Sequence, residues 1–203
     1  MDIDRILTNL KRRRYEAHYF NTKEEAMDYL AAELKGRTIG LGDSATLAAM
    51  GAYDRLSQEN DVVDPVHPLP GEKFRDVAKR TLLREIFISS ANAMSEQGEI
   101  VNIDGTGNRV AGTLFGSEKV YFVIGINKIR PTLEEAIYRA RNIAAPLNSK
   151  RKYPDNPCAR APEMKCYDCS ATDRICNAMT IHFKKMRNTK AMEVLIIGEE
   201  LGF

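Results

Sequence analysis

The chain has 203 residues, of which 43% are apolar and 29% are charged, and its formal net charge at pH 7 is +2. These are the proportions of a globular protein that buries a full core, and so small a net charge excludes a strong field that would attract nucleic acid. No segment approaches the roughly 20 consecutive apolar residues of a membrane span, so we expect one cytoplasmic domain over residues 1–203, with neither a membrane nor a nucleic-acid partner.

The first half of the chain alternates between helical and strand-like patterns. Ile3 to Leu10 places apolar residues on one helical face, and Tyr15 to Phe20 has the pattern of a strand. Thr22 and Glu25 form a predicted capping box that opens a helix through Leu34. The next predicted elements are strands over 38–41, 61–63 and 85–89 and helices over 44–50 and 74–83, the first of these helices closed by Gly51.

The second half continues this alternation up to Ala145. Strands are predicted over 99–103 and 119–126, and a capping box of Thr132 and Glu135 begins a helix that ends near Ala145. A last strand over 192–198 is expected to return to the sheet. This order predicts an α/β fold with a mainly parallel, buried sheet and helices on both faces.

The character of the sequence changes after Ala145. The segment from Pro146 to Pro154 is polar and interrupted by proline, so we expect a loop there. It leads into a predicted loop-rich, cysteine-containing appendage over 149–182.

Two glycine-rich turns each follow an apolar strand-like run and precede a segment with a helical pattern. The first is Gly40-Leu41-Gly42-Asp43-Ser44-Ala45-Thr46 and the second is Asp104-Gly105-Thr106-Gly107-Asn108-Arg109. Both lack the third glycine of a dinucleotide fingerprint and the lysine of a nucleotide-binding P-loop, so no NAD or ATP motif is present. We expect their backbone N–H groups to hold an anionic small molecule, the alternative being tight turns in which Asp43 or Ser44 caps a helix.

Further polar residues cluster after three of the predicted strands, where open α/β sheets place their ligand sites. Arg109 and Lys128 suit a carboxylate or a phosphate. The predicted ligand-binding residues are Gly40, Gly42, Asp43, Ser44, Thr46, Asn92, Asp104, Gly105, Gly107, Asn108, Arg109, Asn127 and Lys128.

Four motifs in this order resemble the lactate-utilisation (LUD) domain family. They are Gly-x-Gly-Asp-Ser-x-Thr at 40–46, Ser-x-Asn-Ala-x-x-x-x-Gly at 90–98, Asn-x-Asp-Gly-x-Gly-Asn-Arg-Val at 102–110 and Gly-x-Asn-Lys at 125–128. The segment at 139–148 and the cysteine tail are similar to the short, stand-alone branch of that family.

The resemblance implies a Rossmann-like α/β fold, shared with ribose-phosphate isomerases, class I CoA transferases and folate-related synthetases. It also implies a part in the oxidation of lactate to pyruvate, in company with iron–sulfur and flavin partner proteins. Kinship of fold does not by itself establish a reaction. A non-catalytic subunit that binds a metabolite, alone or in an oligomer, is a further alternative.

A second resemblance concerns a possible catalytic residue. Ser95-Glu96-Gln97-Gly98 is similar to the Ser-Glu-Asn-Gly motif in which some CoA transferases place a nucleophilic glutamate, with glutamine here in place of asparagine. Glu96 is therefore the candidate catalytic residue of an alternative CoA-transferase-like or phosphosugar-isomerase-like enzyme. The other interpretation is that Glu96 faces solvent in a β-turn.

All four cysteines fall in the predicted appendage. Cys158, Cys166, Cys169 and Cys176 have the spacing C-x7-C-x2-C-x6-C, and the thiolates of a Cys-x-x-Cys pair can reach one metal ion. In a cytosolic chain such clustering favours a metal over disulfides. We expect an iron–sulfur cluster, of the [4Fe–4S] type, or a structural zinc ion, with a disulfide or free thiols as the remaining alternatives.

Overall fold

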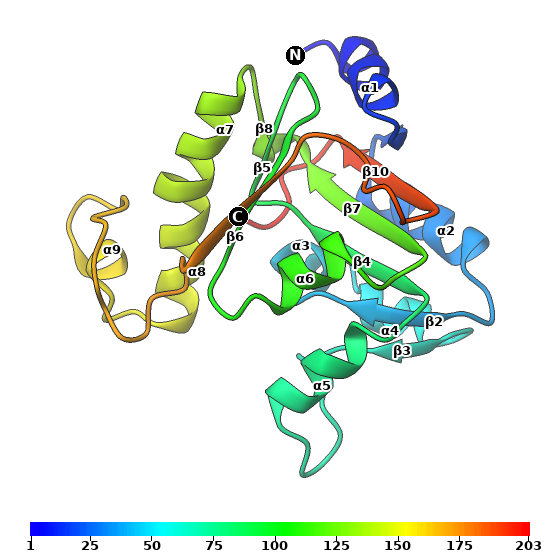
Figure 1. Ribbon diagram of the computed structural model, residues 1–203, viewed down its shortest axis with the longest axis horizontal. Helices are drawn as coiled ribbons and strands as arrows, with labels where there is room; N and C mark the ends of the chain where they lie inside the picture. Colours follow the sequence, from blue (N-terminus) through cyan, green and yellow to red (C-terminus); the bar gives the residue numbers. More distant parts are fainter.

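A sheet of six strands forms the centre of the computed structural model, which describes all 203 residues (Figure 1). Its strand order is β1-β10-β7-β4-β2-β3, and every neighbouring pair is parallel. The strands are β1 (Glu16–Phe20), β2 (Thr38–Leu41), β3 (Asp61–Val63), β4 (Ile86–Ser90), β7 (Lys119–Gly125) and β10 (Ala191–Ile197). The predicted parallel α/β sheet and the return of the last strand are confirmed.

Both faces of this sheet are buried because successive side chains of its strands point to opposite sides. In β7, Tyr121 and Val123 join one apolar cluster, whereas Phe122 and Ile124 join another. Helices α2 (Lys23–Glu33), α3 (Ala45–Ala49) and α4 (Ala52–Leu56) cover the first face, and α1 (Ile3–Arg12) with a second, smaller sheet covers the other.

The capping prediction for α2 is half right. The side chain of Thr22 accepts from the N–H of Glu25, but the carboxylate of Glu25 accepts from the N–H of Asn21 rather than from that of Thr22. Gly51 ends α3 in a left-handed conformation, with a φ of 63°, and at once begins α4, which the sequence did not predict.

The smaller sheet has the order β8-β5-β6-β9. Its strands are β8 (Ile129–Arg130), β5 (Ala93–Ser95), β6 (Ile100–Asp104) and β9 (Ala178–His182). We expected the strand near 99–103 to continue one parallel sheet, but β6 runs antiparallel to β5 and β9. The cause is a tight hairpin between β5 and β6, in which Gly98 has a φ of 90° that reverses the chain.

The predicted loop after Ala145 is also wrong. The helix that the capping box of Thr132 and Glu135 opens as α7 (Leu133–Arg139) passes through a π-helical turn at Ala140–Ala144 and continues as α8 (Ala145–Lys152). Pro146 follows the π-helical turn directly, so the N–H that it lacks falls where the hydrogen-bond ladder of the helix already changes register. The predicted appendage thus starts inside a helix and ends with β9, leaving loops and the short α9 (Pro157–Arg160) between them.

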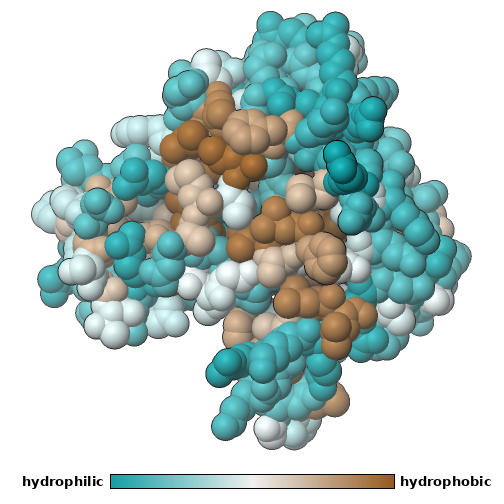
Figure 2. All heavy atoms as spheres, viewed as in Figure 1, coloured by the Kyte–Doolittle hydropathy of each residue, from teal (hydrophilic) through white to brown (hydrophobic).

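Two remaining helices lie beside the sheets, α5 (Phe74–Thr81) and α6 (Asn108–Leu114), the latter directly after the second glycine-rich turn. Figure 2 shows a mostly hydrophilic surface with a band of apolar atoms across the middle of this face. None of the helices combines the length and the apolar character needed to cross a membrane.

Candidate functional site

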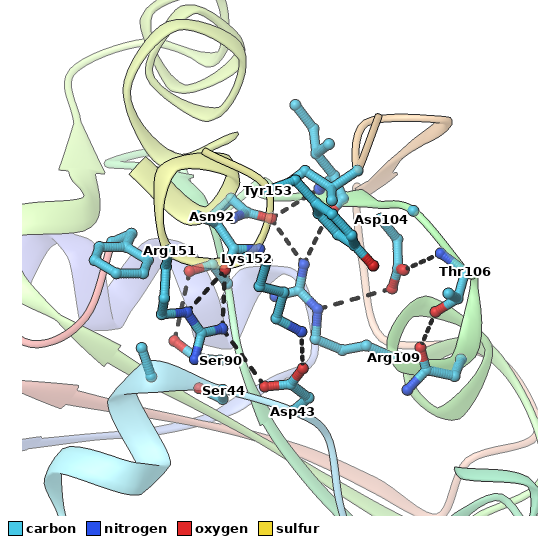
Figure 3. Close-up of a pocket in the computed structure, with 18 of the residues that line it drawn as sticks. Asp43, Ser44, Ser90, Asn92, Asp104, Thr106, Arg109, Arg151, Lys152 and Tyr153 are labelled. Atoms are coloured by element: carbon cyan, nitrogen blue, oxygen red, sulfur yellow. Dashed lines mark hydrogen bonds and ion pairs between the residues drawn. The ribbon is translucent and has the colours of Figure 1, made fainter. Parts of the chain in front are cut away.

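A cavity of about 270 Å³ opens where the chain leaves the carboxyl ends of β2, β4, β6 and β7 (Figure 3). Both glycine-rich turns and the end of α8 contribute to its wall. The sequence-predicted residues that line it are Asp43, Ser44, Asn92, Asp104, Gly105, Asn108, Arg109 and Lys128. The structure therefore brings together most of the side chains that the sequence placed at strand ends.

Five predicted ligand-binding residues lie outside the wall of this cavity, namely Gly40, Gly42, Thr46, Gly107 and Asn127. Two of them support residues that do line it. A side-chain carbon on Gly42 would lie 3.2 Å from Cγ of Arg109, so the glycine leaves room for the arginine stem. The hydroxyl of Thr46 accepts a hydrogen bond from Lys128, and Asn127 instead bonds the backbone of Leu201 and Gly202.

Arg109 is held in the cavity wall by three protein groups. Its Nη2 donates to Oδ1 of Asn92 at 2.9 Å and to the carbonyl of Ile103 at 2.6 Å, and its Nε lies 3.8 Å from Oδ2 of Asp104. Burial lowers the pKa of Arg109, although Asp104 and Asp43 oppose the shift. Because Nη1 donates to no group of the protein, Arg109 keeps one free donor nitrogen for a ligand.

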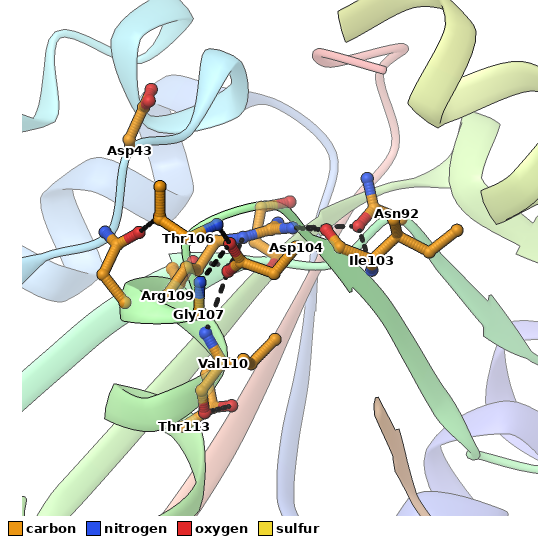
Figure 4. Close-up of polar contacts among 12 residues, drawn as sticks. Asp43, Asn92, Ile103, Asp104, Thr106, Gly107, Arg109, Val110 and Thr113 are labelled. Carbon is orange, nitrogen blue, oxygen red and sulfur yellow. Dashed lines mark hydrogen bonds and ion pairs between the residues drawn. The ribbon is translucent and has the colours of Figure 1, made fainter. Parts of the chain in front are cut away.

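The second glycine-rich turn does not offer its backbone in the way we expected. The carboxylate of Asp104 accepts from the N–H groups of Thr106, Gly107 and Val110, at 3.1, 2.9 and 3.2 Å (Figure 4). An aspartate that caps a helix start in this way satisfies the donors that an anion would otherwise use. For this turn the predicted backbone anion site is therefore already filled by the protein's own carboxylate.

The first glycine-rich turn is different. The N–H of Gly42 pairs with the carbonyl of Ile88, and the hydroxyl of Ser44 accepts from the N–H of Leu47 at 3.4 Å, but the N–H groups of Asp43 and Ser44 have no acceptor in the protein. Both residues line the cavity. The first turn therefore has the free backbone N–H groups that we expected in both glycine-rich turns.

The cavity has a cationic rim that the sequence analysis missed. Arg151 and Lys152 descend from the end of α8, and both pair with the carboxylate of Asp43, with 3.7 Å between Nη2 of Arg151 and Oδ1 (Figure 3). Tyr153 follows them and lines the same wall. Three consecutive basic residues at 150–152 were the available signal, but the proline at 146 led us to read that segment as a loop.

Lys128 forms part of the cavity wall and is only 2% exposed. It lies in the short 3-10 turn Ile126–Lys128 that follows β7, and its Nζ donates to Oγ1 of Thr46 at 2.7 Å and to Oγ of Ser90 at 2.9 Å. No carboxylate pairs with it. Burial lowers its pKa well below the usual value, and the nearby charges of Arg139 and Arg109 lower it further.

Glu96 does not line the cavity. It lies in the hairpin between β5 and β6, pairs with Arg5 of α1, and has its carbonyl bonded by the side chain of Asn9 at 2.9 Å. Arg13 of the same helix donates to the carbonyl of Gln97. These contacts fasten the hairpin to α1.

The four cysteines surround one small hollow of about 20 Å³, separate from the cavity, and all four are partly buried. Arg174 donates to Sγ of Cys176 at 3.3 Å, and Arg141 approaches Sγ of Cys166 at 3.7 Å. No three His, Cys, Asp or Glu side chains are close enough together to hold a metal ion as they stand. Ile175 lines both the hollow and the cavity, so the two lie back to back.

Comparison with known proteins agrees with this architecture. A crystal structure of a DUF162 family protein from Deinococcus radiodurans is similar over 98% of this chain and 99% of that one, with a TM-score of 0.56 and 14% sequence identity. At that identity the likeness extends to the fold alone. No curated protein matches the sequence. The family model of the LUD domain matches residues 3–197, and the chain therefore belongs to the LUD domain family.

Proposed function

We propose that the cavity binds a small organic acid of the 2-hydroxy or 2-oxo class and that the protein takes part in the utilisation of lactate or a related acid. The observation that carries this proposal is the charge of the wall. Three cations line the cavity, Arg109, Arg151 and Lys152, together with the buried Lys128 and only two acidic residues, Asp43 and Asp104. Both carboxylates are already engaged by the protein, so a bound carboxylate would balance the excess.

The geometry indicates how such an acid would be held. Nη1 of Arg109 and the N–H groups of Asp43 and Ser44 have no acceptor in the protein, and all three residues line one cavity. A hydrogen bond from a guanidinium to a carboxylate is charge-assisted and therefore stronger than one between neutral groups. A volume of about 270 Å³ fits an acid of a few carbons with some water. Family membership supports lactate or its oxidised form as the first ligands to try.

We further propose that the four cysteines hold a metal centre, because all of them surround one hollow and arginine N–H groups approach two of their sulfurs. Four cysteine thiolates are a donor set that such centres use, and hydrogen bonds to sulfur tune them, but the four sulfurs must move closer together to hold one ion or cluster. An iron–sulfur cluster would supply one-electron transfer, and a zinc ion would supply a structural cross-link. Iron–sulfur or flavin proteins are the partner class that would accept electrons from the acid.

Calorimetric titration with lactate and with pyruvate tests the binding proposal. Replacing Arg109 with methionine removes the free donor nitrogen, so we expect affinity to fall roughly tenfold to a hundredfold. Arg84→Met is the matched control, because Arg84 pairs with Asp61 elsewhere on the molecule. Equal affinity in the wild type and in the Arg109 variant would refute the proposed site.

The metal proposal has its own test. Protein purified without oxygen should contain iron or zinc by elemental analysis, and an iron–sulfur cluster would add visible charge-transfer absorption. Cys169→Ser should lower the metal content, whereas Ser170→Ala, a change at the next residue, should not. A reduced, metal-free wild type with the same unfolding temperature after anaerobic incubation with zinc, and after incubation with iron together with sulfide, would contradict the proposal.

A further inference from the structure

Lys128 has an unusual set of partners for a buried lysine. Its Nζ bonds only two hydroxyls, and the hydrogens of both hydroxyls point elsewhere, because Thr46 donates to the carbonyl of Leu201 and Ser90 donates to that of Ala91. Both hydroxyl oxygens therefore accept from the lysine nitrogen. Two of its N–H bonds are fixed in this way, without any carboxylate that would stabilise a third proton.

The surrounding charges are cationic. Arg139 is 3% exposed, and its guanidinium donates to the carbonyls of Asn127 and Asn92, which lie on the two loops that carry Lys128 and the cavity wall. Burial, with a contribution from Arg130, lowers the pKa of Arg139 to about 10. Arg109 lines the same cavity, and its charge also acts on Lys128. A lysine among cations and without a counter-ion favours the neutral amine, the form that is nucleophilic.

We propose that Lys128 is a nucleophile that condenses with the keto group of a 2-oxo acid whose carboxylate is bound by Arg109. The inference rests on the proposed function and deepens it, because it separates 2-oxo acids from 2-hydroxy acids at the same site. The hydroxyls of Thr46 and Ser90 position the nitrogen, and Lys128 and Arg109 line the same cavity. When Arg109 holds the carboxylate of a 2-oxo acid, the carbonyl carbon lies one bond away from that carboxylate, inside the cavity that Lys128 also lines.

The step is a balanced condensation. The nitrogen lone pair forms a bond to the carbonyl carbon, and the C–O bond breaks after both amine hydrogens have moved to that oxygen, which leaves as water. The product is an imine between Nζ of Lys128 and C2 of the acid. A proton from solvent then gives the cationic form, which the neighbouring carboxylate stabilises. A 2-hydroxy acid has no carbonyl at C2, so it binds without reacting.

Reductive trapping tests the inference on the full-length protein. Wild type is incubated with pyruvate and sodium cyanoborohydride, which converts an imine into a stable secondary amine, and the modified peptide is identified by mass spectrometry. We expect one three-carbon adduct on Lys128 and none with lactate. The adduct should fall roughly tenfold or more in Lys128→Arg, because a guanidinium does not form the imine. Lys190→Arg, at a 74% exposed side chain paired with Glu118, should leave the yield unchanged.

Calorimetric binding of pyruvate to the wild type separates failure of this inference from failure of the proposed function. If pyruvate binds in the calorimeter but reduction leaves Lys128 unmodified, or labels surface lysines equally, the covalent step is wrong and the binding site stands. If neither acid binds, the proposed function fails and the inference falls with it. The wild-type experiment gives this decision even if the Lys128 variant does not fold.

Discussion

The two glycine-rich turns look alike in sequence and differ in what they offer a ligand. The second turn is closed by Asp104, whose carboxylate takes up three of its N–H groups. The first turn leaves the N–H groups of Asp43 and Ser44 without an acceptor in the protein, and both residues line the cavity. Figure 4 shows the carboxylate of Asp104 directed into the second turn, whereas the carboxylate of Asp43 lies away from that turn.

The position of the aspartate relative to the glycines explains the difference. Asp104 precedes its glycines at the end of β6, so its side chain reaches N–H groups two and three residues ahead. Asp43 follows its glycines and pairs instead with Lys152 of α8. A glycine-rich turn of this kind therefore binds an anion through its backbone only if no acidic side chain is placed to cap it.

Replacing each aspartate with alanine should separate these roles. Asp104→Ala leaves three N–H groups without their acceptor and removes the charge beside Arg109, so we expect a loss of about 3 kcal/mol in the free energy of unfolding. Asp43→Ala removes ion pairs with half-exposed basic side chains and should lower it by less than about 1 kcal/mol. Urea unfolding measures both values, and similar losses would mean that the two turns are built in the same way.

Alanine at one glycine of each turn sharpens the comparison further. A Cβ at Gly42 would lie 2.7 Å from Oγ of Ser89, which is fully buried, so we expect Gly42→Ala to lower the free energy of unfolding by about 2 kcal/mol. The same Cβ would displace Arg109, so acid binding should weaken as well. Gly107 has open space but a φ of 85°, so alanine there should lower stability by about 1 kcal/mol. Unfolding and titration of both variants measure this, and weaker binding in Gly107→Ala alone would reverse the assignment.

Lys128 donates to Thr46 at the start of α3, directly after the first turn, and should make the free energy of unfolding depend on pH. Its folded-state pKa is lowered well below the usual 10.5, so between the two values the unfolded chain binds a proton that the folded protein does not. Stability should therefore rise with pH in that window, by up to about 1.4 kcal/mol per pH unit. Urea unfolding between neutral and alkaline pH should show this rise in the wild type and a flatter one in Lys128→Met. Parallel curves would show that Lys128 stays charged in the folded protein.

Much of the fold was predictable because its signals are local. The apolar run of β7 and the capping box of Thr132 and Glu135 are both found where the sequence placed them. The cavity residues Asn92, Arg109 and Lys128 were predictable for a related reason, since polar residues at the ends of buried strands collect at one edge of the sheet.

The features that the sequence did not reveal depend on contacts between distant segments. The strands β5, β8 and β9 have five residues or fewer and gain stability only by pairing with each other and with β6. Proline breaks a helix in most interior positions, but Pro146 is tolerated because it directly follows the π-helical turn at Ala140–Ala144. Because we predicted a loop there, we did not include Arg151 and Lys152 among the ligand-binding residues. Both reach the cavity because the helix continues as α8.

The most direct test of this account is a titration of ¹⁵N-labelled protein with pyruvate or lactate, followed by amide chemical shifts. We expect the amide signals of Asp43 and Ser44 to move most as the acid binds, whereas those of Thr106 and Gly107, which already bond Asp104, should move little. The opposite pattern, or saturating shifts confined to residues outside the cavity, would contradict the claim that Arg109 and the first turn hold the acid.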